Sequence, residues 1–169
     1  MSFWRTYYHI VWATSERHPL ISTNIEEQLF AYIVKKAGEL GVFIFAIGGW
    51  VDHIHLVAAI PPKLAVSQVV KRLKGSSSRY INQALGDEYT FAWQGGYGIL
   101  TLSESQRKVA EEYVRNQKVH HQQDTTNGWL EYAIECDEGP PNNGLSPSLI
   151  SNGLKEPIAN YHVEDELPF

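Results

Sequence analysis

The chain has 169 residues, of which 43% are hydrophobic and 20% are charged, which suits one globular domain with a buried core. No apolar run approaches the length of about 18 residues that indicates a membrane-spanning helix, and the first residues lack the pattern of a signal peptide. Cys136 is the only cysteine, which excludes an intramolecular disulfide and a multi-cysteine zinc site. We therefore expect a cytoplasmic protein that has no membrane segment.

The net charge of −5 is unevenly distributed along the chain. Six of the 19 acidic residues but only one of the 14 basic residues lie from position 136 onward, which leaves residues 1–135 neutral. Because a phosphate group responds to the local field more than to the total charge, a local excess of basic residues matters most. Such an excess is either a nucleic-acid contact or a solvated helix face. It lies within residues 63–79 and consists of Lys63, Lys71, Arg72, Lys74 and Arg79.

Strands and a helix are predicted in the first third of the chain. Residues 3–13 are rich in aromatic and β-branched side chains, which is typical of a strand. A helix capped by Asn24 should follow to about residue 40, where Gly41 ends it. Residues 42–50 and 51–60 predict two strands joined by a hairpin around residues 48–52, and two prolines stop the second strand.

The second half predicts two long helices with a strand between them. The helices span residues 63–85 and 103–122, and Ser103 with Gln106 forms a capping-box pattern at the start of the second. The strand lies within residues 89–103. The element order β-α-β-β-α-β predicts an α+β fold of the ferredoxin-like split β-α-β type, with an antiparallel sheet and helices on one face. The other face then needs a cover, a partner or a ligand.

The chain should divide into a domain and an extension. Residues 1–125 carry the predicted elements, including the carboxy-terminal helix that bears Tyr113. From residue 137 the sequence is rich in Gly, Pro, Asn and Ser, which favours irregular structure. We therefore expect residues 126–169 to form an extension that is mostly irregular and acidic.

Two histidines, His53 and His55, lie one residue apart in the predicted strand 51–60. Because residues i and i+2 of a strand point to the same side, both imidazoles can bind one ion, while Ile54 and Leu56 face the core. Imidazole suits Mn²⁺ and Zn²⁺ better than Mg²⁺. Two protein ligands leave coordination positions open for substrate, as in a catalytic metal site. A purely structural role for the pair is the alternative.

Tyr113 and Gln117 form a second pair, four residues apart on one face of the last predicted helix. The phenol is a candidate nucleophile and the amide oxygen a candidate third metal ligand. Alternatively, the tyrosine is a half-buried packing residue and the glutamine is solvated. His120 and His121 follow, and they either contact phosphate or stabilise the end of the helix.

Three stretches of the sequence resemble successive blocks of one enzyme family. They are "WVDHIHLVAAIPPKLAVSQVVKRLKGSSSRYI", "FAWQGGYGILTLS" and "VAEEYVRNQKVHH". They are similar, in this order and over about residues 3–125, to the single-tyrosine HUH transposases and their REP-associated relatives. HUH denotes two histidines around a bulky hydrophobic residue, here His53-Ile54-His55. The resemblance implies a divalent metal, Mg²⁺ or Mn²⁺, held by His53, His55 and Gln117, and Tyr113 as the catalytic residue.

The resemblance also implies an activity and partners. Enzymes of this family recognise a DNA hairpin and cleave single-stranded DNA by attack of a tyrosine on a phosphate, which leaves a 5′-phosphotyrosine and a free 3′-hydroxyl for strand transfer. They often form homodimers, and in some of these the tyrosine helix serves the partner's histidines. From charge alone, we expect the DNA contacts to come from six residues: Lys71, Arg72, Lys74, Arg79, Arg115 and Lys118.

Three functions of other classes stay open on the sequence alone. The first is a non-catalytic protein that binds hairpin or single-stranded nucleic acid, which would need neither the histidines nor the tyrosine. The second is a small metal-dependent hydrolase in which Tyr113 is structural, so that cleavage would persist without its hydroxyl. The third is a ferredoxin-like domain that binds only a protein partner, which would have no affinity for metal or DNA.

Overall fold

The computed structural model describes residues 3–86 and 90–128 together with residues 130, 131 and 133. Four strands form one antiparallel sheet of order β2-β3-β1-β4: β1 (Tyr7–Ala13), β2 (Phe43–Gly49), β3 (His53–Ala59) and β4 (Gly98–Leu102). The helices are α1 (Thr23–Glu39), α2 (Val66–Leu85), α3 (Glu104–Arg115) and α4 (Gln117–Gln122), with a short 3-10 helix at Ser15–Arg17. This order confirms the predicted ferredoxin-like arrangement.

The predicted carboxy-terminal extension and the prediction of no membrane segment can be compared with the structure only where residues are described. Most of the expected extension 126–169 lies outside the described residues, as do residues 87–89 between α2 and β4. In the part that is described, none of the helices is long and apolar enough to span a membrane.

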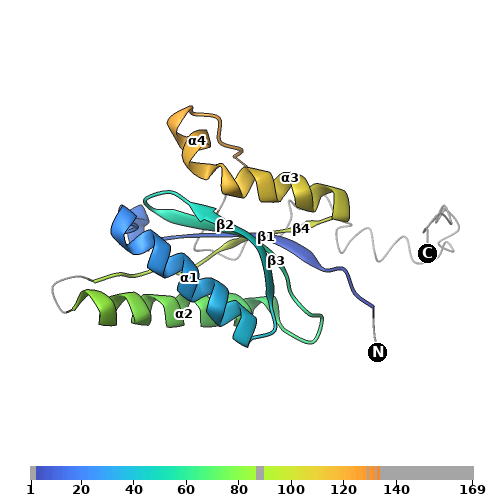
Figure 1. Ribbon diagram of the computed structural model, residues 1–169, viewed down its shortest axis with the longest axis horizontal. Coiled ribbons are helices and arrows are strands. Elements are labelled where there is room, and N and C mark those ends of the chain that lie inside the picture. The colour runs from blue at the N-terminus through green and yellow to red at the C-terminus, as the bar shows by residue number, and fades with distance from the viewer. Residues whose placement is uncertain (1–2, 87–89, 129, 132, 134–169) are drawn as a thin grey trace, which may run out of the picture. The chain divides into compact units, whose positions relative to one another are not determined.

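Helices cover both faces of the sheet. Figure 1 shows α1 and α2 on one face and α3 with α4 on the other. The two helices of the ferredoxin-like core thus lie on one face as expected, and α3 provides the cover that the other face needs, because it packs across β1, β2, β3 and β4. Every residue of β3 is consequently buried, as is usual for a strand covered on both sides.

The alternation of side chains along β3 separates a hydrophobic core from a polar site. Ile54 and Leu56 point toward α1 and α2, where they join the main core with Trp12 of β1 and other apolar residues. His53 and His55 point the other way, toward α3. The second face holds a smaller cluster of short side chains: Ala46, Val57, Ala110 and Val114.

The ends of the helices differ in detail from the sequence prediction. Ser22, rather than Asn24, precedes α1 as its N-cap residue. The capping box of α3 is confirmed, because Ser103 and Gln106 each accept a hydrogen bond from the other's backbone N–H. The predicted helix 103–122 is divided at Asn116, whose φ of −100° and ψ of 16° leave the helical range. Tyr113 therefore lies in the last turn of one helix, and Gln117 begins the next.

A glycine in β2 permits the close approach of α3 to the sheet. A Cβ atom built on Gly48 would lie 2.0 Å from the backbone carbonyl oxygen of Val114 in α3. Backbone atoms cannot rotate away as a flexible side chain can, so any larger residue must lift the helix that carries Tyr113. By contrast, a Cβ atom on Gly38, near the end of α1, meets no atom within 4 Å.

We therefore expect Gly48→Ala and Gly38→Ala to change stability in opposite directions. Gly48→Ala should lower the free energy of unfolding by about 1–3 kcal/mol or more, because the overlap with α3 can be relieved only by backbone movement. Gly38→Ala should raise it by about 0.5–1 kcal/mol, because alanine favours the helix. Urea denaturation of both variants measures this, and equal effects would contradict the tight packing of α3 on β2.

Candidate metal centre

Two buried histidines of β3 form the centre of the site. His53 and His55 are 1% and 0% exposed, and both lie beneath α3 and α4. The carboxylate of Glu131 reaches them from beyond α4. Its Oε2 atom lies 3.0 Å from Nε2 of His53 and 3.2 Å from Nε2 of His55. These three residues have ligand atoms within 4.8 Å of one another and form a group that could hold a metal ion.

Outer partners orient both rings toward the same point. Nδ1 of His53 lies 2.6 Å from Oδ1 of Asp52, and Nδ1 of His55 lies 2.9 Å from Nε2 of His9 in β1. When each Nδ1 carries its proton and donates it to these partners, both Nε2 lone pairs are free to bind a metal. Carboxylate and histidine partners of this kind typically fix the tautomer of metal-binding histidines. Arg17 in turn holds Asp52 at 3.1 Å.

The local charges favour a cation at this point. Burial alone would lower the pKa of His53, but its hydrogen bonds with Asp52 and Glu131 raise it to about 9. Burial would raise the pKa of Glu131, yet hydrogen bonds from His53 and His55 hold it below its usual range, so the carboxylate is ionised. His9 is neutral, because burial and the nearby His55 lower its pKa to about 3. A divalent ion bound by the Nε2 atoms would displace the proton of His53.

Gln117 supplies an amide at the same place. It is 1% exposed, and its Nε2 donates to Oε1 of Glu131 at 3.2 Å. Its Oε1 is buried and has no hydrogen-bond partner in the part of the chain that the structure describes. Two imidazoles, a carboxylate and an unpaired amide oxygen are a donor set that suits Mn²⁺ and similar divalent ions. The residues present thus fit a metal.

The phenol of Tyr113 is attached to the same carboxylate. Its Oη donates to Oε1 of Glu131 at 2.5 Å and accepts a hydrogen bond from the backbone N–H of Asn127 at 2.9 Å. Burial and the hydrogen bond to Glu131 raise the pKa of this phenol above its ordinary value. The ring packs edge-on to His55, with 6.2 Å between the ring centroids. The tyrosine and both histidines therefore meet within a single chain.

The two histidines of α4 also take part in the site. The ring of His120 stacks on Tyr113 with 4.6 Å between centroids. The ring of His121 stacks on Trp50 at 5.1 Å, and its Nε2 lies 3.2 Å from Nε2 of His53. Both rings thus pack around Tyr113 and the histidines of β3.

The sequence analysis missed three residues of the site. Asp52 directly precedes His53, and His9 is placed opposite Val57 in the pairing of β1 with β3, so strand register could have indicated both. Glu131 follows α4 outside any regular element, and no spacing rule connects it to the histidines. Glu131 and Asn127 lie in the region that we assigned to the extension, yet both bond to Tyr113.

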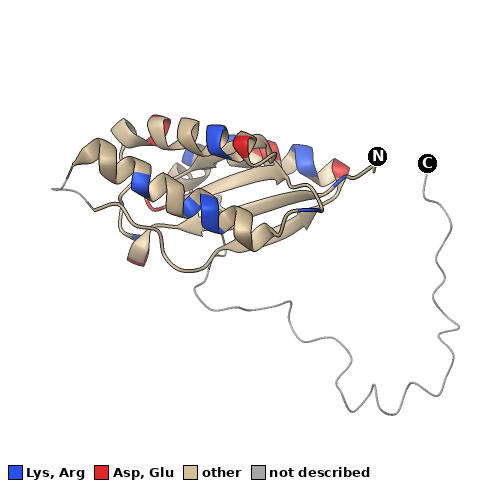
Figure 2. Cartoon of the chain, turned by 90° about the horizontal axis from the view of Figure 1, so that it is seen from below, with Lys and Arg blue, Asp and Glu red and all other residues tan. Residues whose placement is uncertain are grey.

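The predicted DNA-binding residues of α2 divide into two groups. Lys71, Arg72 and Arg79 are exposed on the face of the molecule formed by α1 and α2, which Figure 2 views with basic residues in blue. Lys74 is buried, and its ammonium group donates to three carbonyl oxygens at 2.6–3.0 Å, those of residues 94, 95 and 96. Its charge holds this loop against α2, so we do not assign a phosphate contact to Lys74.

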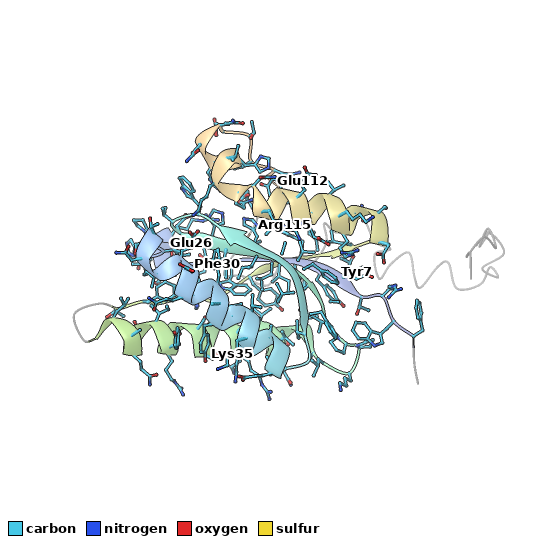
Figure 3. All side chains as sticks on the ribbon, viewed as in Figure 1. Tyr7, Glu26, Phe30, Lys35, Glu112 and Arg115 are labelled. Atoms are coloured by element: carbon cyan, nitrogen blue, oxygen red, sulfur yellow. The ribbon has the colours of Figure 1, made fainter. Side chains whose placement is uncertain are left out.

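The two remaining basic residues belong to the opposite face and are ion-paired. Arg115 of α3, labelled in Figure 3, donates to the carbonyl oxygen of Phe45 at 2.9 Å and to Glu111 at 3.0 Å. Lys118 of α4 pairs with Glu26 near the start of α1. Neither side chain shares a helix with Lys71, Arg72 and Arg79, and each already has a partner within the protein.

Fold and site together define an α+β domain with helices on both faces of its sheet and with a histidine pair and a tyrosine under one helical layer.

Residues 2–117 match the family described as "Transposase IS200 like". The chain is 29% identical over 115 residues to the ISDra2 transposase TnpA of Deinococcus radiodurans, covering 65% of this chain and 82% of the relative. It is also 29% identical over 119 residues to the Salmonella typhimurium transposase for insertion sequence element IS200, covering 68% and 78%.

Solved structures agree with these relatives. A crystal structure of a Deinococcus radiodurans R1 protein described as a transposase matches with a TM-score of 0.56 and 28% identity, over 69% of this chain and 95% of that one. A REP-associated tyrosine transposase bound to a REP hairpin matches in fold, with a TM-score of 0.54 and 18% identity over 76% of each chain. The chain belongs to the family of IS200-like transposases.

We expect Asp52→Ala to weaken metal binding without unfolding the domain. The loss of the carboxylate frees Nδ1 of His53, so the ring is no longer held with its Nε2 lone pair toward the site. The affinity for Mn²⁺ should fall about 10–100-fold, as is usual for such outer partners. Isothermal titration calorimetry measures this, with the exposed Glu27→Ala in α1 as the control. Equal affinities in both variants would show that Asp52 does not orient the ring.

Proposed function

We propose that this transposase cleaves single-stranded DNA next to a hairpin by attack of Tyr113, and then transfers the strand. The observation that carries the proposal is the shared carboxylate of Glu131. One of its oxygens accepts a hydrogen bond from the phenol of Tyr113, and the other contacts Nε2 of both His53 and His55. A nucleophile and a metal group that meet on one carboxylate are placed to act on the same phosphate.

The reaction is a direct exchange of one phosphate ester for another. Oη of Tyr113 attacks phosphorus in line with the 3′ oxygen, so that the Oη–P bond forms as the P–O3′ bond breaks. The phenol loses one proton and the departing 3′ oxygen gains one, so neither water nor net protons are consumed. The product is a 5′-phosphotyrosine and a free 3′-hydroxyl, and attack by another 3′-hydroxyl reverses the step with a new partner.

A bound divalent metal would polarise the scissile phosphate and stabilise the charge of the transition state. His53, His55 and Gln117 would hold it, and the open positions would face the DNA. The residues of the chain orient the attack. The backbone N–H of Asn127 donates to the phenol oxygen, and the ring of His120 stacks on the phenol ring, so both restrict the position of the side chain. Because phenol is a poor nucleophile when it is protonated, this positioning matters for the rate.

Hairpin DNA is the substrate that we propose, because the REP-associated relative is bound to a REP hairpin. The exposed residues Lys71, Arg72 and Arg79 lie on the opposite face of the sheet from Tyr113. Phosphates that they contact must therefore belong to a part of the DNA away from the cleaved bond. We propose that Tyr113 acts with the histidines of its own chain, because Glu131 contacts all three of these side chains.

We expect Tyr113→Phe to abolish covalent attachment to DNA while DNA binding persists. Only the hydroxyl is lost, and it is the atom that must bond to phosphorus. Protein is incubated with labelled hairpin DNA carrying a single-stranded flank and Mn²⁺, and a denaturing gel reports the shifted protein–DNA band. Tyr32→Phe is the matched control, because Tyr32 stacks on Tyr80 between α1 and α2, on the other face of the sheet.

The results separate the proposal from the other classes of function. Normal cleavage by Tyr113→Phe would show a metal-dependent hydrolase instead. Binding of the hairpin by the wild-type protein with no covalent band in any metal would favour a non-catalytic nucleic-acid binding protein. Absence of both binding and cleavage with hairpins from the flanking genome would contradict the proposed substrate.

We further expect Arg72→Gln to weaken hairpin binding more than Lys118→Gln does. Both changes remove one positive charge, but Lys118 is paired with Glu26, whereas Arg72 is exposed on the basic face of α2. In a plot of the logarithm of the binding constant against the logarithm of the salt concentration, the slope for Arg72→Gln should be shallower than that of the wild type by about 0.9, which corresponds to one phosphate contact. Fluorescence anisotropy at several salt concentrations measures this. An equal slope in both variants would show that Arg72 of α2 does not contact a phosphate of the DNA.

A further inference from the structure

The part of the chain beyond the family match contributes a charged residue to the site. The match to IS200-like transposases ends at residue 117, and Glu131 lies beyond it. The segment returns from α4 to the sheet, where the side chain of Glu131 is 16% exposed. In this position the carboxylate bonds to four side chains: His53, His55, Tyr113 and Gln117.

We propose that Glu131 is a further protein ligand of the metal through Oε2, and that its Oε1 holds the nucleophile Tyr113 beside the ion. Glu131 would then add an anionic donor to the histidines and glutamine that the family resemblance implies. The inference rests on the proposed function, because it assigns a role at that same site.

The distances support a ligand position. Two atoms bound to one ion at about 2.0–2.2 Å, at angles between octahedral and tetrahedral, lie roughly 2.8–3.6 Å apart. Oε2 of Glu131 lies 3.0 Å and 3.2 Å from the two Nε2 atoms. An ion between these three atoms would thus need little movement of the side chains. It would replace the proton through which His53 and Glu131 now interact.

The charges and the hydrogen bonds agree with this position. Two imidazoles and an amide bring no negative charge, whereas Mg²⁺ and Mn²⁺ favour carboxylate oxygen. The carboxylate is also held in place from its other side, because its Oε1 accepts hydrogen bonds from Tyr113 Oη at 2.5 Å and from Gln117 Nε2 at 3.2 Å. A carboxylate fixed by one oxygen leaves the other directed at the histidines.

The same contacts have a second explanation, which the experiment must separate. In it, Glu131 is a competitor that occupies the place of a phosphate and neutralises His53, and it must leave before metal and DNA bind. A ligand and a competitor predict opposite changes of metal affinity when the charge is removed.

The experiment measures Mn²⁺ binding to the full-length protein without DNA, by calorimetry, for the wild type and for Glu131→Gln. Glutamine has nearly the same shape and keeps a hydrogen-bonding group for Tyr113. We expect the dissociation constant to rise by about tenfold or more. Glu112→Gln is the matched control on the exposed side of α3, and it should leave the constant unchanged.

An unchanged dissociation constant in Glu131→Gln would overturn the inference, and a lower one would in addition identify the carboxylate as a competitor. Circular dichroism checks that the variant is folded. The rise in Tm that Mn²⁺ produces gives an independent reading if the variant is less stable: a rise as large as in the wild type contradicts a ligand role.

A covalent-trapping assay at saturating Mn²⁺ tests the second half of the inference. Glu131→Gln should form the phosphotyrosine band about tenfold more slowly than the wild type, because a neutral amide oxygen accepts the hydrogen bond of the phenol more weakly than a carboxylate does. A wild-type rate would contradict the positioning role. If the wild type forms the band and Glu131→Gln binds Mn²⁺ normally, the proposed function stands and this inference fails. If the wild type binds Mn²⁺ through Glu131 but never forms a band, the inference about the metal stands and the proposed function fails.

Discussion

The burial of β3 on both faces is the constraint on which the rest of the structure depends. One face of the strand supplies Ile54 and Leu56 to the main core, and the other supplies His53 and His55 to the site. Polar groups in such a place need partners, since an unpaired buried imidazole loses its hydration without compensation. The surrounding residues provide these partners. Asp52, His9 and Glu131 each bond to a ring nitrogen, so the same burial that demands hydrogen bonds also orients the rings.

The structure places Tyr113 and the two histidines of β3 in one chain and under one helical layer. Tyr113 lies in the last turn of α3, and Asn116 interrupts the helix three residues later, so α4 turns its own histidines toward the same point. The geometry favours an enzyme over a simple binding domain, because a binder has no need of a phenol bonded to the carboxylate that touches both imidazoles. The DNA contacts are less concentrated. The exposed basic residues of α2 lie on the far side of the sheet from this centre.

Local sequence signals predicted the strands, the helices and the histidine pair, because each depends on residues close together in the chain. The period-2 pattern of residues 53–56 separated core from site correctly, and Ser103 with Gln106 placed the start of α3. Long-range placement was not predictable in this way. Lys74 belongs to a basic stretch by its neighbours, yet its ammonium group satisfies three carbonyl oxygens of a loop some 20 residues away. Glu131 likewise gains its place from the path of the chain after α4.

The contact at Gly48 also determines how tolerant the site is of change. Since the carbonyl oxygen of Val114 occupies the volume of a missing Cβ atom, backbone against backbone sets the height of α3 above the sheet. Side chains such as Ala46, Val57 and Ala110 fill the remaining space between α3 and the sheet but do not set the distance between them. The separation of Tyr113 from the histidines is thus a property of the main chain. Substitutions in this small cluster would therefore lower the stability step by step. The distance between Tyr113 and the two histidines would stay nearly constant.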